Sequence, residues 1–161
     1  MSRVALSLLA LHVVCAAAWA PAPASAQGRT HAVIITGLGG TDAFRESFHA
    51  EASTLYDALV DRHGLSPEDV TYLGEKVEVD PDRIALRSTR ANVLQTFAEI
   101  AARAAPMDRL LVVMIGHGTA GGGEVQFNLP GPDLTPSDLL EGLGAFPTQT
   151  LALVHTGSAS G

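Results

Sequence analysis

Residues 110–119 read Leu110-Leu-Val-Val-Met-Ile-Gly-His-Gly-Thr119, a continuous apolar run that ends in a histidine between two glycines. An apolar run without polar alternation is typical of a strand that is buried on both faces, as in a parallel sheet. Shorter runs of the same kind occur at 31–36, 70–73 and 151–154. These four strands predict one sheet, with the residues that follow each strand gathered at its carboxyl edge.

The segments between the strands predict helices that cover the sheet. Apolar residues recur at helical spacing over 44–62, and Gly64 ends this helix. A second helix is expected over 88–105 with Ser88 as its N-cap, and a third from Thr135 with Pro136 in its first turn. We expect an exposed loop over 75–86 and a glycine-rich loop after Thr119. Alternating strands and helices predict an α/β three-layer sandwich with a mainly parallel sheet.

The first 26 residues predict a secretory signal peptide. Arg3 precedes an almost wholly apolar run over 4–19, and Ala24-Ser25-Ala26 is a small-x-small cleavage pattern. That run holds 16 residues, whereas a membrane-spanning helix needs roughly 20. We therefore expect a secreted or periplasmic protein whose mature form, residues 27–161, is one α/β domain outside the membrane.

Composition excludes several classes of partner and cofactor. The chain has 161 residues, with 10 Lys and Arg against 17 Asp and Glu, for a formal charge of −7. Because nucleic-acid binding depends on clustered cations, no nucleic-acid partner is expected. Cys15 is the only cysteine and lies in the expected signal peptide, so neither a disulfide nor a cysteine-based zinc site is expected. No histidine pair has metal-ligand spacing, and Asp42 stands where a dinucleotide motif after Gly37 needs its third glycine. We expect no metal and no cofactor.

His117 and Ser158 are the candidate reactive residues. Both follow apolar strands that a helical crossover joins, so their side chains are expected to lie next to each other. A serine beside a histidine is the minimum arrangement for nucleophilic catalysis. The alternatives are a structural role for His117 and a simple small-residue turn over 157–161. His155 is expected at the surface.

Four segments carry a resemblance to a known family. They are Ala32-Val-Ile-Ile-Thr-Gly37, Asp108-Arg-Leu-Leu-Val-Val-Met-Ile-Gly-His-Gly-Thr119, Phe127-Asn-Leu-Pro-Gly-Pro-Asp-Leu-Thr135 and Leu151-Ala-Leu-Val-His-Thr-Gly-Ser-Ala-Ser-Gly161. Their order and spacing resemble the caspase/legumain-like clan of cysteine peptidases, and in particular a set of uncharacterised secreted bacterial members. The resemblance covers residues 31–161.

The resemblance implies a role for several residues. His117 matches the catalytic histidine, and Gly118 matches the glycine whose backbone N–H binds the substrate oxyanion. Ser158 stands at the cysteine nucleophile position, and Arg45 matches a substrate-pocket arginine. Ala43 stands where legumain-like enzymes have the asparagine that orients the histidine.

These substitutions predict a secreted peptidase-like protein with reduced or lost activity and a peptide-binding cleft. A serine hydroxyl is not ionised at neutral pH and depends on a well-oriented base, which the loss of the asparagine puts at risk. One alternative is an active Ser158–His117 hydrolase that acts on peptide bonds, and another is a non-catalytic structural domain. Sheets of this clan continue past the nucleophile strand, so the resemblance also implies a chain that continues beyond Gly161.

Overall fold

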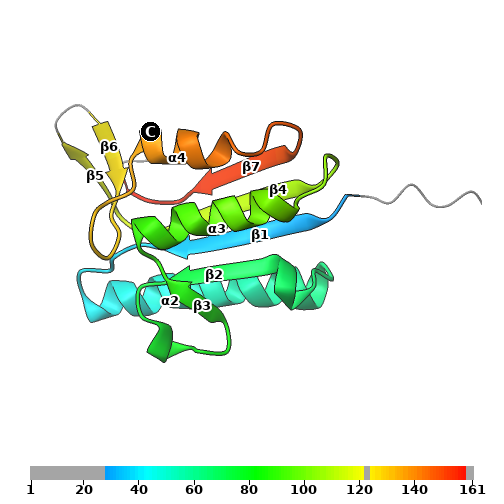
Figure 1. Ribbon diagram of the computed structural model, residues 1–161. Coiled ribbons are helices and arrows are strands. Elements are labelled where there is room, and N and C mark those ends of the chain that lie inside the picture. Colours follow the sequence, from blue (N-terminus) through cyan, green and yellow to red (C-terminus); the bar gives the residue numbers. More distant parts are fainter. Residues whose placement is uncertain (1–27, 122–123, 159–161) are drawn as a thin grey trace, which may run out of the picture.

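The computed structural model describes residues 28–121 and 124–158, and it contains a parallel five-stranded sheet (Figure 1). The strand order is β3-β2-β1-β4-β7, and every pairing in this sheet is parallel. Its strands are β1 (Thr30–Thr36), β2 (Val70–Gly74), β3 (Ile84–Arg87), β4 (Arg109–Ile115) and β7 (Thr150–His155). The expected signal peptide and Ala159-Ser160-Gly161 lie outside the described residues.

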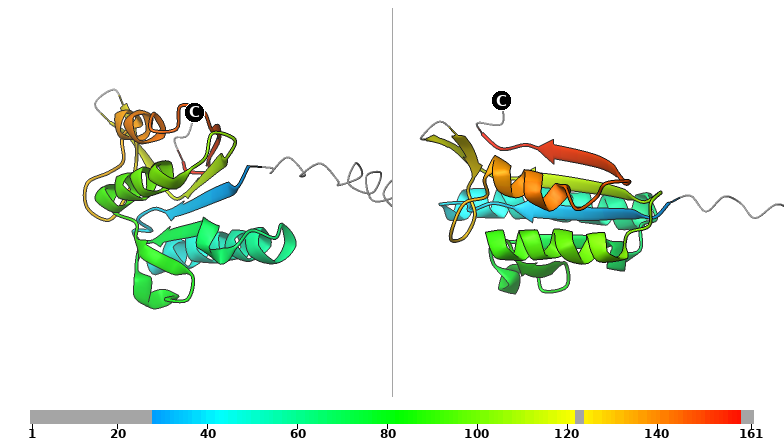
Figure 2. Two further views of the ribbon diagram at one scale, coloured as in Figure 1. Left: turned by 45° about the vertical axis from the view of Figure 1, so that its right-hand side comes forward. Right: turned by 45° about the horizontal axis from the view of Figure 1, so that its top comes forward.

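Helices cover both faces of the sheet and form three layers (Figures 1 and 2). One face packs against α2 (Asp42–Asp57) and the π-helical turn η1 (Ala58–Arg62) that continues it. The other face packs against α3 (Arg90–Arg103) and α4 (Pro136–Leu143). The α/β class and the mainly parallel sheet predicted from the sequence are therefore confirmed.

Successive side chains of β1 point to opposite faces of the sheet and belong to two different hydrophobic cores. Val33 and Ile35 face the α3 side, whereas Ala32 and Ile34 face the α2 side. All four are buried, because a central parallel strand has a helix layer above and below it. This is the physical basis of the uninterrupted apolar run in the sequence.

The register of β4 and β7 sets the position of the candidate site. Met114 pairs with His155 at the end of the two strands, and beyond them His117 and Ser158 form an isolated parallel bridge. Residues that are 41 apart in the sequence therefore leave the sheet side by side.

Two segments expected as loops contain strands. The stretch 75–86 holds the short 3-10 helix η3 (Val77–Val79) and most of β3, where Ile84 is buried. The glycine-rich segment after His117 forms an antiparallel hairpin of β5 (Gly118–Gly121) and β6 (Glu124–Phe127). All three strands are only four residues long, which is too short for a clear apolar periodicity in the sequence.

Helix starts differ in detail from those expected. The N-cap of α3 is Thr89, whose hydroxyl accepts from the Asn92 backbone N–H at 3.3 Å. Ser88 instead donates its own N–H to Gly74 O at 2.7 Å, which keeps it in the extended chain after β3. For α4 the expected Thr135 N-cap and the position of Pro136 in the first turn are confirmed. A further short 3-10 helix, η2 (Pro67–Asp69), directly precedes β2.

Within the described residues, none of the helices combines the length and the apolar character needed to cross a membrane.

Candidate functional site

His117, Gly118 and Ser158 meet at the carboxyl edge of the sheet. The Ser158 Oγ lies 3.5 Å from Nδ1 of His117 and accepts the backbone N–H of Gly118 at 3.4 Å. The predicted neighbourhood of His117 and Ser158 is confirmed. Their catalytic role stays a prediction. The Ser158–His117 contact is longer than the roughly 2.6–3.2 Å of a productive nucleophile–base hydrogen bond.

The glycines around His117 are needed for close backbone packing. A Cβ on Gly118 would stand 2.5 Å from the Ser158 carbonyl oxygen, and one on Gly116 would stand 3.0 Å from Gly37 Cα. The space beside both glycines is filled by neighbouring backbone. The N–H of Gly118 donates to Ser158 Oγ here, and its expected role as the oxyanion donor stays a prediction.

Two phenylalanine rings flank the His117 imidazole. The ring centroid of Phe44 lies 4.5 Å from that of His117, and the centroid of Phe48 lies 5.0 Å from it. Both rings stand nearly perpendicular to the imidazole, at 85° and 72°. Within the described chain, Ser158 is the only residue with a hydrogen-bond contact to the His117 ring.

The asparagines do not replace the missing orienting residue. The backbone of Asn128 lies next to that of His117, because the Asn128 N–H donates to His117 O at 2.9 Å. Its side-chain oxygen, however, accepts from the Thr119 hydroxyl at 2.8 Å. Asn92 is on α3 and donates its side-chain N–H to Arg87 O. The His117 ring is therefore held by packing and by Ser158.

Arg45 is engaged by two carboxylates. Its Nε lies 3.0 Å from Glu75 Oε1, and its terminal nitrogen contacts Asp42. The hydrogen bond to Glu75 is the main cause that raises the pKa of the guanidinium above its ordinary value, and the hydrogen bond to Asp42 adds to it. Glu75 is buried and also accepts the Gly39 N–H at 3.0 Å, so Arg45 is anchored to the loop after β1. The proposed substrate contact of Arg45 stays a prediction.

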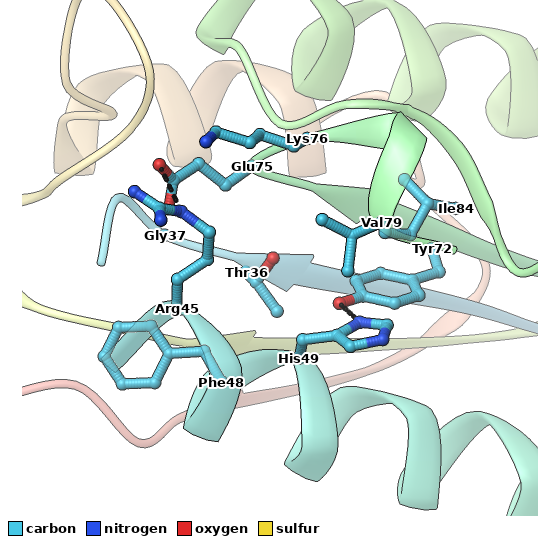
Figure 3. A pocket seen from close by; sticks show the side chains of 10 residues that line it. All are labelled: Thr36, Gly37, Arg45, Phe48, His49, Tyr72, Glu75, Lys76, Val79 and Ile84. Carbon is cyan, nitrogen blue, oxygen red and sulfur yellow. Dashed lines mark hydrogen bonds and ion pairs between the residues drawn. The ribbon is translucent and has the colours of Figure 1, made fainter. Parts of the chain in front are cut away.

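A pocket next to Arg45 lies between α2 and the segment after β2 (Figure 3). This pocket is small, with a volume of about 10 Å³. A second hollow of about 240 Å³ adjoins it, and the two share the lining residues Arg45, His49, Lys76 and Val79. The Tyr72 hydroxyl lies 3.1 Å from His49 Nδ1, and burial raises the pKa of Tyr72 to about 12. Phe48 lines this pocket and also contacts His117, which makes the pocket and the serine site neighbours.

His155 is not at the surface as expected. It is half-buried, and its ring stands edge-on to Phe127 at a centroid distance of 5.3 Å. Burial lowers the pKa of the imidazole. A Cβ on Gly157 would stand 2.6 Å from its Nε2, so the turn that leads to Ser158 packs directly over this ring. The β5–β6 hairpin, which the sequence did not reveal, supplies Phe127.

The described residues contain no group of three or more His, Cys, Asp or Glu side chains placed to hold a metal ion.

The site residues that sequence reasoning missed are Phe44, Phe48 and Glu75. Phe44 and Phe48 are four residues apart on a helix, which places them on one face. That spacing was available in the sequence as a signal.

No protein-family description and no curated protein sequence matches this chain.

Proposed function

We propose that the carboxyl edge of the sheet is a peptide-binding cleft of the caspase/legumain type, in which Ser158 stands at the nucleophile position and hydrolysis is slow or lost. The observation that carries this proposal is the contact of Ser158 Oγ with both His117 Nδ1 and Gly118 N, at 3.5 and 3.4 Å. Nucleophile, base and oxyanion donor are the three groups that acyl transfer needs at one point.

Two features support slow or absent turnover. A serine needs a correctly oriented base throughout its attack, and misorienting the histidine of a serine triad costs about 10⁴-fold in rate. In the described residues no carboxylate or amide side chain hydrogen-bonds to the His117 ring, and the Ser158 contact is long. A cleft with this chemistry retains binding more easily than catalysis.

The thiol variant Ser158→Cys tests the site directly. An imidazolium neighbour lowers a thiol pKa from about 8.5 towards 4–7. We expect iodoacetamide to alkylate this variant at pH 6 about tenfold or more faster than a free thiol, since the thiolate fraction rises accordingly. His117→Ala in the same background should remove the advantage. An ordinary thiol rate–pH profile in both proteins would show that His117 does not address position 158.

Peptide binding is the second arm of the test. A pool of fluorescein-labelled random pentapeptides is titrated with the protein, and fluorescence anisotropy is measured. Ser158→Tyr fills the cleft and should abolish binding. Ser66→Tyr is the matched control, because Ser66 is an exposed serine before η2 at the opposite edge of the sheet. No binding by the wild-type chain would favour a structural domain instead.

An active Ser158–His117 hydrolase is the second candidate, because Ser158 Oγ contacts both the His117 ring and the Gly118 N–H. A fluorophosphonate probe separates the two functions, since it labels only a serine whose base removes the hydroxyl proton during attack. Labelling that is lost in Ser158→Ala and in His117→Ala supports the hydrolase, and absence of labelling supports the binding cleft.

We also propose that the protein is exported and that residues 1–26 are removed. The apolar run over 4–19 and the Ala24-Ser25-Ala26 pattern support this. Intact-mass analysis of the protein from its native host should give a chain that begins at Gln27. A mature protein that retains Met1 would contradict the proposal.

A further inference from the structure

We infer that Phe44 and Phe48 are positioning residues that hold the His117 imidazole towards Ser158, in place of a hydrogen-bonded orienting side chain. The catalytic meaning of this inference rests on the proposed function, but the contact itself does not. The three rings form one cluster: Phe44 and Phe48 are stacked at 5.9 Å and 27°, and both stand nearly perpendicular to His117. Perpendicular, edge-to-face pairs at 4.5–7 Å are a favourable aromatic geometry.

The sequence builds this cluster from one helix face. Phe44 and Phe48 are four residues apart in α2, so their side chains lie one above the other. The Thr41 N-cap accepts the Phe44 N–H at 3.4 Å, which places Phe44 in the first turn of the helix. Phe48 is 9% exposed and belongs to the core under β4, whereas Phe44 is 49% exposed. One ring therefore anchors the cluster, and the other closes it from the solvent side.

Two perpendicular contacts limit how the imidazole can rotate. With Phe44 and Phe48 in place, turning the His117 ring away from Ser158 costs the contacts at 4.5 and 5.0 Å. A phenyl ring differs from an asparagine or aspartate in one respect, because it accepts no conventional N–H hydrogen bond. The cluster thus fixes the direction of the ring, but it does not determine which ring nitrogen carries the proton. This agrees with a site that binds peptides and hydrolyses them slowly or not at all.

Substitution of Phe44 tests the inference without opening the core, since this side chain is half exposed. In the Ser158→Cys background, Phe44→Leu should lower the iodoacetamide rate at pH 6 by about two- to tenfold, the range of one edge-to-face contact. The rate at pH 9, where the thiol ionises without help, should stay unchanged. Phe44→Tyr should restore the pH 6 rate. Tyr56→Leu, which removes an aromatic ring from the same helix three turns away, should have no effect.

A second measurement keeps this inference separate from the proposed function. In the chain with Ser158 intact, the NMR signals of the His117 ring protons should be displaced from those of a free histidine by the phenyl ring currents, and Phe44→Leu should move them back. If Ser158→Cys shows an ordinary thiol profile, the proposed function fails, while Phe44-dependent His117 shifts still support the positioning contact. His117 shifts that do not change in Phe44→Leu, or an enhanced pH 6 rate that Phe44→Leu leaves intact, overturn the inference.

Discussion

His31 lies buried at the amino edge of the sheet, between two carboxylates. Its Nδ1 is 3.3 Å from Asp69 Oδ1, and its Nε2 is 3.4 Å from Asp108 Oδ2. Asp108 also accepts the backbone N–H groups of Arg29 and Ala105 at 2.7 and 2.8 Å. A single carboxylate thus connects the start of β1 with the turn that precedes β4. This residue cluster stabilises the end of the sheet that is farthest from Ser158.

Asp108→Asn should destabilise the fold in a pH-dependent way. Burial by itself raises the pKa of Asp108, but the N–H donors of Ala105 and Arg29, together with His31, lower it below its ordinary value. A carboxyl whose folded pKa is depressed contributes stability above its unfolded pKa, near 4, and the contribution disappears as the pH falls through the folded pKa. We expect a loss of about 1.5–3 kcal/mol at pH 7, which shrinks below about pH 4.

Urea unfolding at pH 7 and pH 3 measures this difference. Asp61→Asn is the matched control, because Asp61 is an exposed carboxylate in η1. A destabilisation by Asp108→Asn that is equal at both pH values would show that the charge of Asp108 contributes nothing.

The sequence predicted some residue contacts and not others, for a physical reason. The meeting of His117 and Ser158 follows from the rule that parallel strands end at one edge, because His117 lies shortly after the end of β4 and Ser158 lies shortly after the end of β7. The Arg45–Glu75 pair joins α2 to the segment after β2, and the His155–Phe127 contact joins β7 to a hairpin. Such contacts depend on how elements pack, which local patterns do not encode.

At the scale of elements, apolar composition decides what the pattern reveals. The predicted strands contain apolar runs, such as residues 32–35 of β1 and residues 110–115 of β4. β3 is an edge strand, and three of its four residues are exposed, so its sequence resembles a loop. β5 begins at Gly118 and has small side chains, and glycine is unfavourable in strands. Pairing with β6 across the hairpin stabilises it instead.

The start of α4 offers a test at this scale. The Thr135 hydroxyl accepts the Asp138 N–H at 3.1 Å, and the Asp138 carboxylate accepts the Thr135 N–H at 2.9 Å, which is a capping box. The hydrogen bond from the Thr135 backbone lowers the pKa of Asp138 and outweighs the opposing effect of its partial burial. Thr135→Ala should therefore lower the free energy of unfolding by about 1 kcal/mol, as measured by urea denaturation. Ser137→Ala, at an exposed position in the same turn, should have little effect.

Across the whole molecule, α2 links two neighbouring features at the carboxyl edge of the sheet. Phe44 and Phe48 contact His117, while Arg45 and His49 line the pocket beside Glu75. All four side chains belong to α2. The rings beside His117 and the residues that line the pocket are therefore placed by the same helix.

The last prediction concerns β7, which lies at one edge of the described sheet. Among the described strands of the sheet, β7 pairs with β4 alone, and its side chains Leu151, Leu153 and Val154 are 41%, 47% and 44% exposed. Thr150–His155 contains no acidic, Lys, Arg or Pro residue, and an uncharged apolar edge strand is a site of unwanted pairing between molecules. Leu153→Lys should reduce concentration-dependent light scattering of the purified protein, because a lysine on an edge disfavours such pairing.

Leu140→Lys is the control for this variant, since Leu140 is 78% exposed but lies on α4 and not on a strand edge. If exposed apolar area alone drove self-association, Leu140→Lys would reduce the scattering at least as much as Leu153→Lys. If the unpaired backbone of β7 is the cause, the effect is specific to the strand, because a helix has its N–H and C=O groups bonded internally. Equal effects of the two variants would contradict the edge-strand explanation, and circular dichroism spectra of both should match that of the wild-type chain.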